Sequence, residues 1–116
     1  MVETKIYTLD ELTGMLRPII DRHNVEKAVV FGSYARGTAT PESDLDVLVY
    51  GGEGFRCRSV FAIAEELHEA SGKRVDVYER SELLDGSPLL DAIDKEGVMI
   101  GAIEGNGEVA QAIFVQ

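Results

Sequence analysis

Two aspartates with strand spacing are the residues of this chain most suited to chemistry. Asp44 and Asp46 alternate at the start of an apolar run that predicts a strand over residues 44–50. Their carboxylates would project from one face, roughly 7 Å apart at the backbone, and would repel each other unless a cation lay between them. Mg²⁺ suits such a pair because it binds through one or two carboxylates plus substrate phosphates. Asp76, central in a predicted strand over 74–78, supplies a third carboxylate that is costly to bury unless it is paired or bound to metal.

A second group of residues suits phosphate binding. Gly32 and Ser33 follow a predicted buried strand over residues 26–31, at a turn that can start a helix. Backbone N–H groups at a helix start are unsatisfied and favour anions, and Gly32 lets a phosphate approach the backbone closely. The Ser33 hydroxyl adds a donor, Arg36 can neutralise a phosphate oxygen, and Ser43 is a further candidate donor.

Three acids beside a phosphate-binding turn predict two-metal transfer of a phosphoryl-type group. In such chemistry one ion holds the triphosphate and the other activates the attacking hydroxyl. Structural interpretations stay open for four residues: Arg36 in an ion pair with Glu42 or Asp44, Ser43 in a local turn bond, Tyr34 covering the turn rather than stacking on a base, and Asp76 facing water or Lys73.

The spacing of these motifs resembles that of a known superfamily. Gly-Ser, ten residues, then Asp-x-Asp resembles the signature of the DNA polymerase β-like nucleotidyltransferases, and GSYARGTATPESDLDVLV resembles their minimal nucleotidyltransferase (MNT) branch. The similarity covers about residues 25–80, and the order of elements fits to about 101. The resemblance implies these roles: Gly32 and Ser33 in nucleotide-phosphate binding, Asp44 and Asp46 as Mg²⁺ ligands, and Asp76 as the third carboxylate, with Arg36 matching the Arg of the common GSxARG string.

Proteins of this size and motif resemble the antitoxin half of HEPN/MNT toxin–antitoxin pairs. Larger relatives add domains that hold the acceptor, so here we expect the acceptor to bind a shallow surface or to be supplied by a partner chain. The resemblance implies a Mg²⁺-dependent enzyme, with two ions, that transfers AMP from ATP to a hydroxyl, that of a Tyr, on a partner HEPN-type toxin. Two alternatives are an antitoxin that neutralises its partner by contact with little or no catalysis, and nucleotidyl transfer to a small molecule or an RNA end.

Composition and charge limit which other classes of protein this chain could belong to. The 116 residues include 11 Lys and Arg against 21 Asp and Glu, which gives a formal charge of −10. That charge argues against direct binding of nucleic acids or anionic membranes and is compatible with a basic protein partner. The single Cys57 excludes an internal disulfide framework and fits a reducing compartment. With no apolar run long enough to span a bilayer and no signal peptide, we expect a cytoplasmic protein.

The elements that must position these residues alternate between strands and helices. Thr8 and Glu11 predict a capping box at the start of the first helix, and Pro18 predicts a kink or break within it. We expect helices over residues 9–23, 55–71 and 87–96, one helical turn over 81–85, and strands over 26–31, 44–50, 74–78 and 98–100.

This order predicts an α/β (α+β) fold of one domain over residues 1–116, with a small mixed sheet flanked by helices. The first two strands lie too close in sequence for a helical crossover, which favours an antiparallel pair. The core covers about residues 8–101. The tail over 102–116 is unassigned, with a turn at 105–107 and an edge strand or a docked segment over 110–115.

Several other residues are given structural roles. The apolar stripe predicted for the second helix is Cys57, Val60, Phe61, Ala64 and Leu67, with Cys57 as a small core residue. The acids predicted to form a solvated face of that helix are Glu65, Glu66 and Glu69. The two histidines, His23 and His68, have no partners at metal-ligand spacing.

Overall fold

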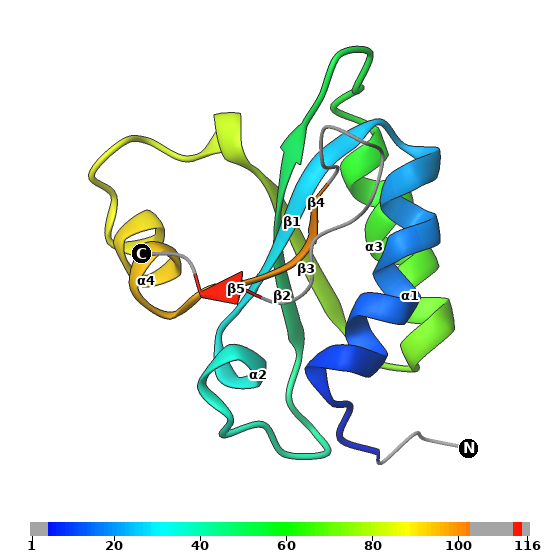
Figure 1. Cartoon of the computed structure of the whole chain (residues 1–116), viewed down its shortest axis with the longest axis vertical. Helices are drawn as coiled ribbons and strands as arrows, with labels where there is room; N and C mark the ends of the chain where they lie inside the picture. The colour runs from blue at the N-terminus through cyan, green and yellow to red at the C-terminus, as the bar shows by residue number, and fades with distance from the viewer. Residues whose placement is uncertain (1–4, 103–112, 115–116) are drawn as a thin grey trace.

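The computed structural model describes residues 5–102 and 113–114 and shows a mixed sheet with helices on both faces (Figure 1). Its helices are α1 (Leu9–Arg22), α2 (Ser33–Arg36), α3 (Ser59–Ser71), the 3₁₀ turn η1 (Arg80–Glu82) and α4 (Pro88–Glu96). Its strands are β1 (Val25–Phe31), β2 (Leu45–Gly51), β3 (Val75–Glu79), β4 (Val98–Ala102) and β5 (Ile113–Phe114). The predicted alternation of elements is confirmed.

The sheet has the strand order β3-β2-β1-β4-β5. β1 pairs antiparallel with both β2 and β4, and β4 pairs antiparallel with β5. β2 and β3 run parallel, joined by the crossover through α3, in a register that sets Asp46 beside Asp76. The mixed sheet and the antiparallel first pair are therefore as predicted, because the connection between β1 and β2 is too short for a crossover helix.

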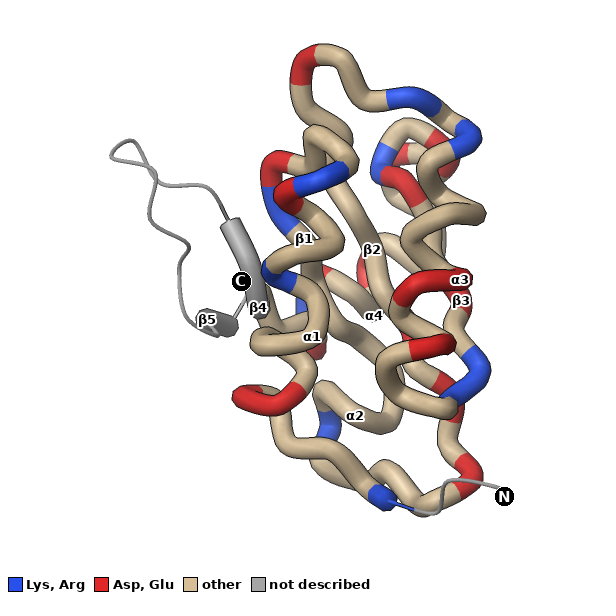
Figure 2. The backbone as a smooth tube through the Cα atoms, turned by 90° about the vertical axis from the view of Figure 1, so that its right-hand side faces the viewer, with Lys and Arg blue, Asp and Glu red and all other residues tan. Residues whose placement is uncertain are grey.

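The two faces of the sheet are covered differently. α1 and α3 cover one face and bury a large cluster with the sheet, whereas α4 lies on the other side and α2 lies at one end of the sheet (Figure 1). The cluster on the α4 side is small and consists of Val29, Phe31, Leu48 and Ile93. Most charged residues lie on the helices and on the loops around the sheet (Figure 2).

Helix α1 begins as the sequence predicts. The backbone N–H of Glu11 donates to the Thr8 hydroxyl, and the Glu11 carboxylate accepts from the backbone N–H of Thr8, which completes the capping box. The helix continues through Pro18 to Arg22, so the break considered there does not occur. His23 then caps the helix, with its Nε2 2.6 Å from a Glu66 carboxylate oxygen.

Helix α3 shows where the predicted stripe was wrong. It begins at Ser59 rather than at 55, so Cys57 lies in the preceding turn and is exposed. Phe61 is 79% exposed, because it projects from the side opposite the buried Ile63 and Leu67. Glu66 is also not merely a solvated acid, because it accepts hydrogen bonds from the residues that end α1.

The remaining predictions concern the C-terminal part. The predicted turn at 105–107 and residues 110–112 and 115 of the predicted edge strand lie outside the described residues. Within the described part, 113–114 form β5, which pairs with β4. None of the helices described here combines the length and apolar character needed to cross a bilayer.

Candidate active site

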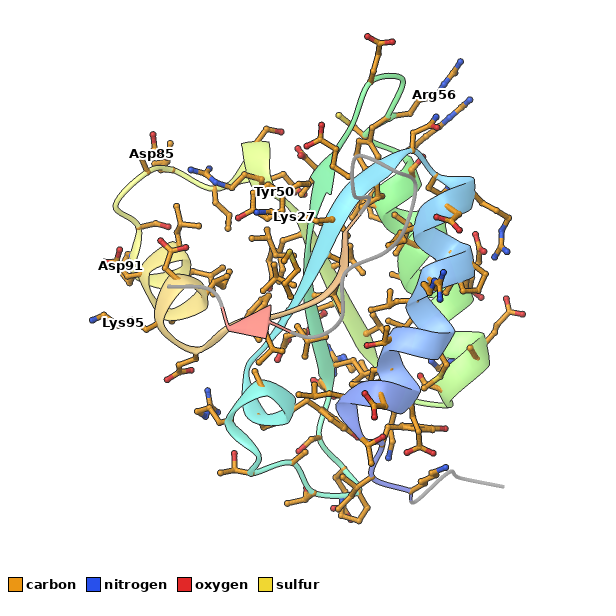
Figure 3. All side chains as sticks on the ribbon, in the orientation of Figure 1. Lys27, Tyr50, Arg56, Asp85, Asp91 and Lys95 are labelled. Carbon is orange, nitrogen blue, oxygen red and sulfur yellow. The ribbon has the colours of Figure 1, made fainter. Side chains whose placement is uncertain are left out.

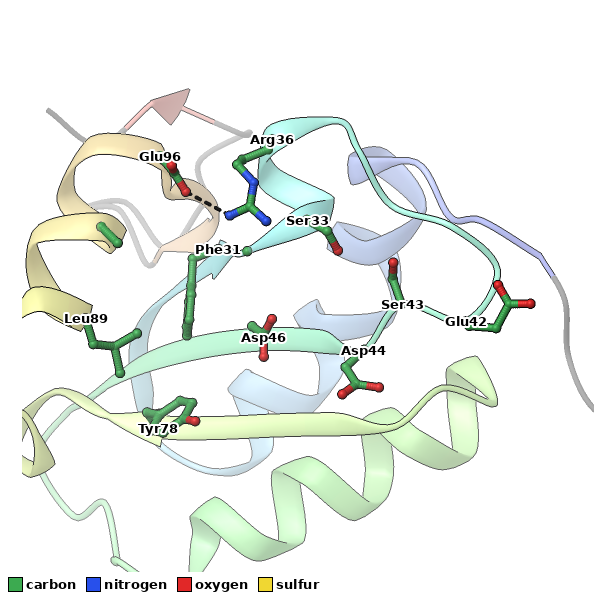
Figure 4. A pocket seen from close by; sticks show the side chains of 12 residues that line it. Phe31, Ser33, Arg36, Glu42, Ser43, Asp44, Asp46, Tyr78, Leu89 and Glu96 are labelled. Carbon is green, nitrogen blue, oxygen red and sulfur yellow. Dashed lines mark hydrogen bonds and ion pairs between the residues drawn. The ribbon is translucent and has the colours of Figure 1, made fainter.

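A cavity of about 630 Å³ opens on the α4 side of the sheet, where β1, β2, β3, α2 and α4 meet (Figure 4). One end of the cavity is polar and carries most of the residues singled out in the sequence. The other end is apolar. The lining residues are Phe31, Gly32, Ser33, Arg36, Glu42, Ser43, Asp44, Asp46, Tyr78, Leu89, Ala92 and Glu96.

Gly32 holds the turn between β1 and α2 close to Asp46. Its backbone has φ 77° and ψ −152°, a region essentially restricted to glycine. A Cβ at this position would lie 2.5 Å from Asp46 Oδ2. The close approach lets the start of α2, with Ser33 half-buried in the cavity wall, stand beside the carboxylates. The sequence-predicted juxtaposition of the Gly-Ser turn and the second strand is therefore present.

Asp46 is influenced by the charges of two further carboxylates, those of Asp76 on β3 and of Asp44 just before β2. Asp46 and Asp76 are register partners on neighbouring parallel strands, so their side chains share a face of the sheet. Burial, followed by the charges of Asp76 and Asp44, raises the pKa of Asp46 to about 6, and Arg36 opposes this shift. All three aspartates are half-buried. Asp76 is not among the residues lining the cavity, where β3 contributes Tyr78 instead.

The donor chemistry of this cluster fits a divalent cation. Among the described residues, no group of three or more His, Cys, Asp or Glu side chains stands as a formed metal site. However, burial and then the charges of Asp76 and Asp44 raise the pKa of Asp46, so its ionised form is one that a bound cation would stabilise. Carboxylate oxygens are the ligands that Mg²⁺ prefers. Asp44 and Asp46, with Asp76 beside them, are thus the residues able to hold such an ion.

The remaining predicted residues have defined contacts. Arg36 Nη1 donates to Glu96 Oε2 at 3.0 Å, rather than to either of the two acids considered from the sequence. Ser43 Oγ accepts a hydrogen bond from the backbone N–H of Thr40 at 2.8 Å, which confirms the local turn bond, while the residue also lines the cavity.

Two further residues near the turn have purely structural positions. Tyr34 is only 5% exposed and packs into the large core cluster, so it covers the turn from within and is not placed to stack on a base. Lys73 is buried and donates from Nζ to the Pro41 carbonyl at 2.7 Å. Lys73 therefore stabilises the loop before β2.

The apolar end of the cavity was missed from the sequence. The rings of Phe31 and Tyr78 lie 5.9 Å apart, and Leu89 of α4 stands beside them (Figure 4). Burial, followed by the charges of Asp76 and Asp46, raises the pKa of Tyr78. The alternation of side chains along β3 could have revealed Tyr78, because it is two residues from Asp76. No local signal marks Leu89 or Glu96.

Comparisons with known proteins find a matching family and similar chains. The family model described as Nucleotidyltransferase domain matches residues 14–98. A candidate protein adenylyltransferase of Methanocaldococcus jannaschii, MJ0435, is 41% identical over 69 residues, which cover 60% of this chain and 74% of that protein. Protein adenylyltransferase MntA of Thermococcus cleftensis is 35% identical over 83 residues, which cover 68% of this chain and 84% of that protein.

Solved structures share the fold. A toxin–antitoxin crystal structure with AMP-PNP aligns with a TM-score of 0.65 and 18% identity, covering 82% of this chain and 77% of that one. A complex of a tri-AMPylated Shewanella oneidensis HEPN toxin with its MNT antitoxin aligns with a TM-score of 0.53 and 20% identity, covering 78% and 66%. At these identities the similarity extends to the fold alone.

Proposed function

Because this chain belongs to the nucleotidyltransferase domain family, we propose that it transfers AMP from ATP to a protein hydroxyl, with a Tyr of a HEPN-type toxin as the acceptor. Membership in the family makes the chain a nucleotidyltransferase. The proposal adds the nucleotide, the Mg²⁺ ions and the acceptor. The observation that carries it is that Asp44, Asp46 and the Gly32 turn line one end of a single cavity, with Asp76 in register beside Asp46 on the neighbouring strand.

The polar end of the cavity suits the triphosphate. Ser33 and the first backbone N–H groups of α2 supply hydrogen-bond donors, and Arg36 supplies a cation. Asp44 and Asp46 would hold two Mg²⁺ ions, which when bound neutralise phosphate charge and lower the pKa of the attacking hydroxyl. In the transfer, the acceptor oxygen bonds to the α-phosphorus, the bond from that phosphorus to the pyrophosphate oxygen breaks, and Asp76 helps take up the hydroxyl proton.

The apolar end of the cavity suits an aromatic acceptor. Asp76 and Tyr78 project from the same face of β3, roughly 7 Å apart at the backbone. A phenol with its oxygen at the carboxylates would therefore lay its ring along Tyr78 and Leu89. A Ser or Thr hydroxyl would leave this surface without contact. The length and apolar character of the wall thus support a Tyr acceptor.

The partner is supported by the relatives and by charge. The two relatives described above bear the name protein adenylyltransferase, and one structure with the same fold is a complex with a modified HEPN toxin. The formal charge of −10 is complementary to a basic ribonuclease. We therefore place the chain as the antitoxin of such a pair.

The test is incubation with labelled ATP, Mg²⁺ and a candidate HEPN toxin, followed by intact mass measurement of the toxin. We expect wild type to add the mass of AMP and Asp44→Asn/Asp46→Asn to add none. The matched control is Asp10→Asn/Asp21→Asn, which removes the same charge from exposed positions on α1. Equal labelling by wild type and the active-site variant would refute the roles of the aspartates.

The same variant separates the two modes of neutralisation. If Asp44→Asn/Asp46→Asn protected cells from the toxin as strongly as wild type, neutralisation would occur by contact and not by AMP transfer. If wild type added no mass to the toxin but did so to a small molecule or an RNA end, the acceptor would be wrong while the enzyme class would stand.

A further inference from the structure

Arg36 is the single basic residue among the twelve that line the cavity. It shares the cavity wall with four acids: Glu42, Asp44, Asp46 and Glu96. Its guanidinium is engaged by one of them, because Arg36 Nη1 donates to Glu96 Oε2 at 3.0 Å (Figure 4). The pair joins α2 to the last residue of α4 across the polar end of the cavity.

Glu96 takes one donor of the Arg36 guanidinium, and a phosphate that used the same donor would have to displace it. A guanidinium presents a planar fork of N–H donors that matches the oxygens of a carboxylate and of a phosphate equally well. A single edge of that fork cannot serve both groups at once. Because the two side chains are 47% and 40% exposed, the ion pair is weak and can exchange for a stronger ligand.

We propose that Glu96 is a competing internal ligand of Arg36, which the phosphates of the nucleotide must displace. The inference rests on the proposed function and deepens it, because it concerns the nucleotide affinity of the same site. Glu96 also adds negative charge beside the incoming triphosphate, so it disfavours free ATP more than ATP that carries Mg²⁺. Glu96 therefore lowers the affinity for nucleotide and sharpens the preference for its magnesium complex.

A positioning role for Glu96 makes the opposite prediction. If Glu96 held Arg36 in the orientation that phosphate needs, removal of its charge would weaken nucleotide binding. Competition predicts that the same change strengthens binding. The sign of one measurement decides between these roles.

The experiment is a calorimetric titration with α,β-methylene-ATP, in which the bond that transfer would break is replaced. Wild type and Glu96→Gln are titrated with and without Mg²⁺, and thermal unfolding verifies that both are folded. We expect Glu96→Gln to lower Kd by about two- to fivefold with Mg²⁺, the size expected for an exposed ion pair, and by more without it. The charge control is Asp91→Asn, on the outer side of α4 (Figure 3), for which we expect less than a twofold change.

A double-mutant cycle with Arg36→Gln tests whether Glu96 acts through the guanidinium. Because the competition acts through the guanidinium, Glu96→Gln should give little gain in the Arg36→Gln background. Magnesium pyrophosphate, a probe without the nucleoside, should show the same gain from Glu96→Gln as the nucleotide analogue.

The outcomes separate the inference from the proposed function. Unchanged or weaker binding by Glu96→Gln, an equal gain in Asp91→Asn, or a full gain in the Arg36→Gln background would each overturn the competition while leaving the proposed function intact. If wild type bound no analogue with Mg²⁺, the proposed function and the inference would both fail.

Discussion

The two faces of the sheet are built from the same strands, but one face forms the core and the other carries the candidate active site. On the α1 and α3 face, Leu45, Val47 and Val49 of β2 join a large and fully buried core. On the α4 face, Asp46 and Leu48 of the same strand meet a small apolar cluster and an open cavity. Alternate residues of one strand thus supply stability and chemistry separately. Substitutions on the two faces should therefore affect different measurements.

The largest effect is expected at the carboxylates. Asp46→Asn should reduce AMP transfer about 100-fold or more, because it removes a carboxylate that would hold the Mg²⁺ needed to neutralise the phosphates. Its free energy of unfolding should stay the same or rise, since the change relieves repulsion with Asp76 and Asp44. Rates of AMP transfer and urea unfolding, measured on the same preparation, give the activity and the stability. A marked loss of unfolding free energy would show that Asp46 contributes to stability as the core residues do.

A core substitution on the opposite face should show the reverse pattern. Ile63 is fully buried between α3 and the sheet, so Ile63→Ala should cost about 3 kcal/mol of unfolding free energy. Under conditions where the variant is folded, the rate of AMP transfer should match that of wild type. Urea unfolding and initial rates provide the comparison. A large loss of rate in the folded variant would show that the two faces are coupled.

Gly32 lies where the two faces meet, so Gly32→Ala should impair both properties. The new Cβ would contact Asp46 Oδ2 at 2.5 Å and would strain a backbone conformation restricted to glycine, at a cost of about 2 kcal/mol. We expect AMP transfer to fall more than tenfold. The matched control is Gly37→Ala, which has φ 77° and no atom within 4 Å of the added Cβ. It should lose stability only, and equal losses of transfer would contradict the crowding argument.

The raised pKa of Asp46 predicts a pH dependence of stability without divalent cations. Because its pKa rises from 3.8 unfolded to about 6 folded, the folded state binds more protons between these values, and this residue's contribution to stability is lost as pH increases from about 4 to 6. The half-exposed carboxylate should contribute about 1 kcal/mol. We expect the stability of wild type relative to Asp46→Asn to fall by that amount over this range in EDTA. A constant difference would argue against the raised pKa.

The smallest effects are expected on the outside of α3 and in the turn before it. Cys57 and Phe61 are exposed, so Cys57→Ser and Phe61→Ala should each change the unfolding free energy by less than about 0.5 kcal/mol. Native Cys57 should also react with a thiol reagent as readily as in the unfolded chain. Protection of the thiol, or a loss of unfolding free energy above about 1 kcal/mol in either variant, would show that these side chains are buried, as the predicted apolar stripe requires.

Local patterns were enough to predict the strands and the acids they carry. The alternation from Asp44 to Tyr50 fixed which residues face the core, and the short connection after Phe31 fixed the antiparallel pair. The position of Asp76 beside Asp46 follows from the crossover through α3. Each of these inferences depends on residues close in sequence or on a general rule of connection.

The errors have a common cause, which is tertiary placement. The first turn of α3 was extended too far, because Phe55 and Cys57 continue a helical spacing that the chain does not adopt. The partner of Arg36 was sought among neighbouring acids, whereas Glu96 lies 60 residues away on α4. The fold of α4 over the cavity depends on packing at Ile93, which no local pattern specifies.

The parallel pairing of β3 with β2 bears on how the enzyme assembles. Gly32 and Asp46 are 14 residues apart, whereas Asp46 and Asp76 are 30 apart and must await the crossover helix. Loop closure is entropically more demanding for the longer separation. A chain still emerging from the ribosome can thus form the phosphate side of the cavity before the acceptor side exists. Catalytic competence should be acquired only once β3 joins the sheet, so chains that end before β3 should be inert as transferases.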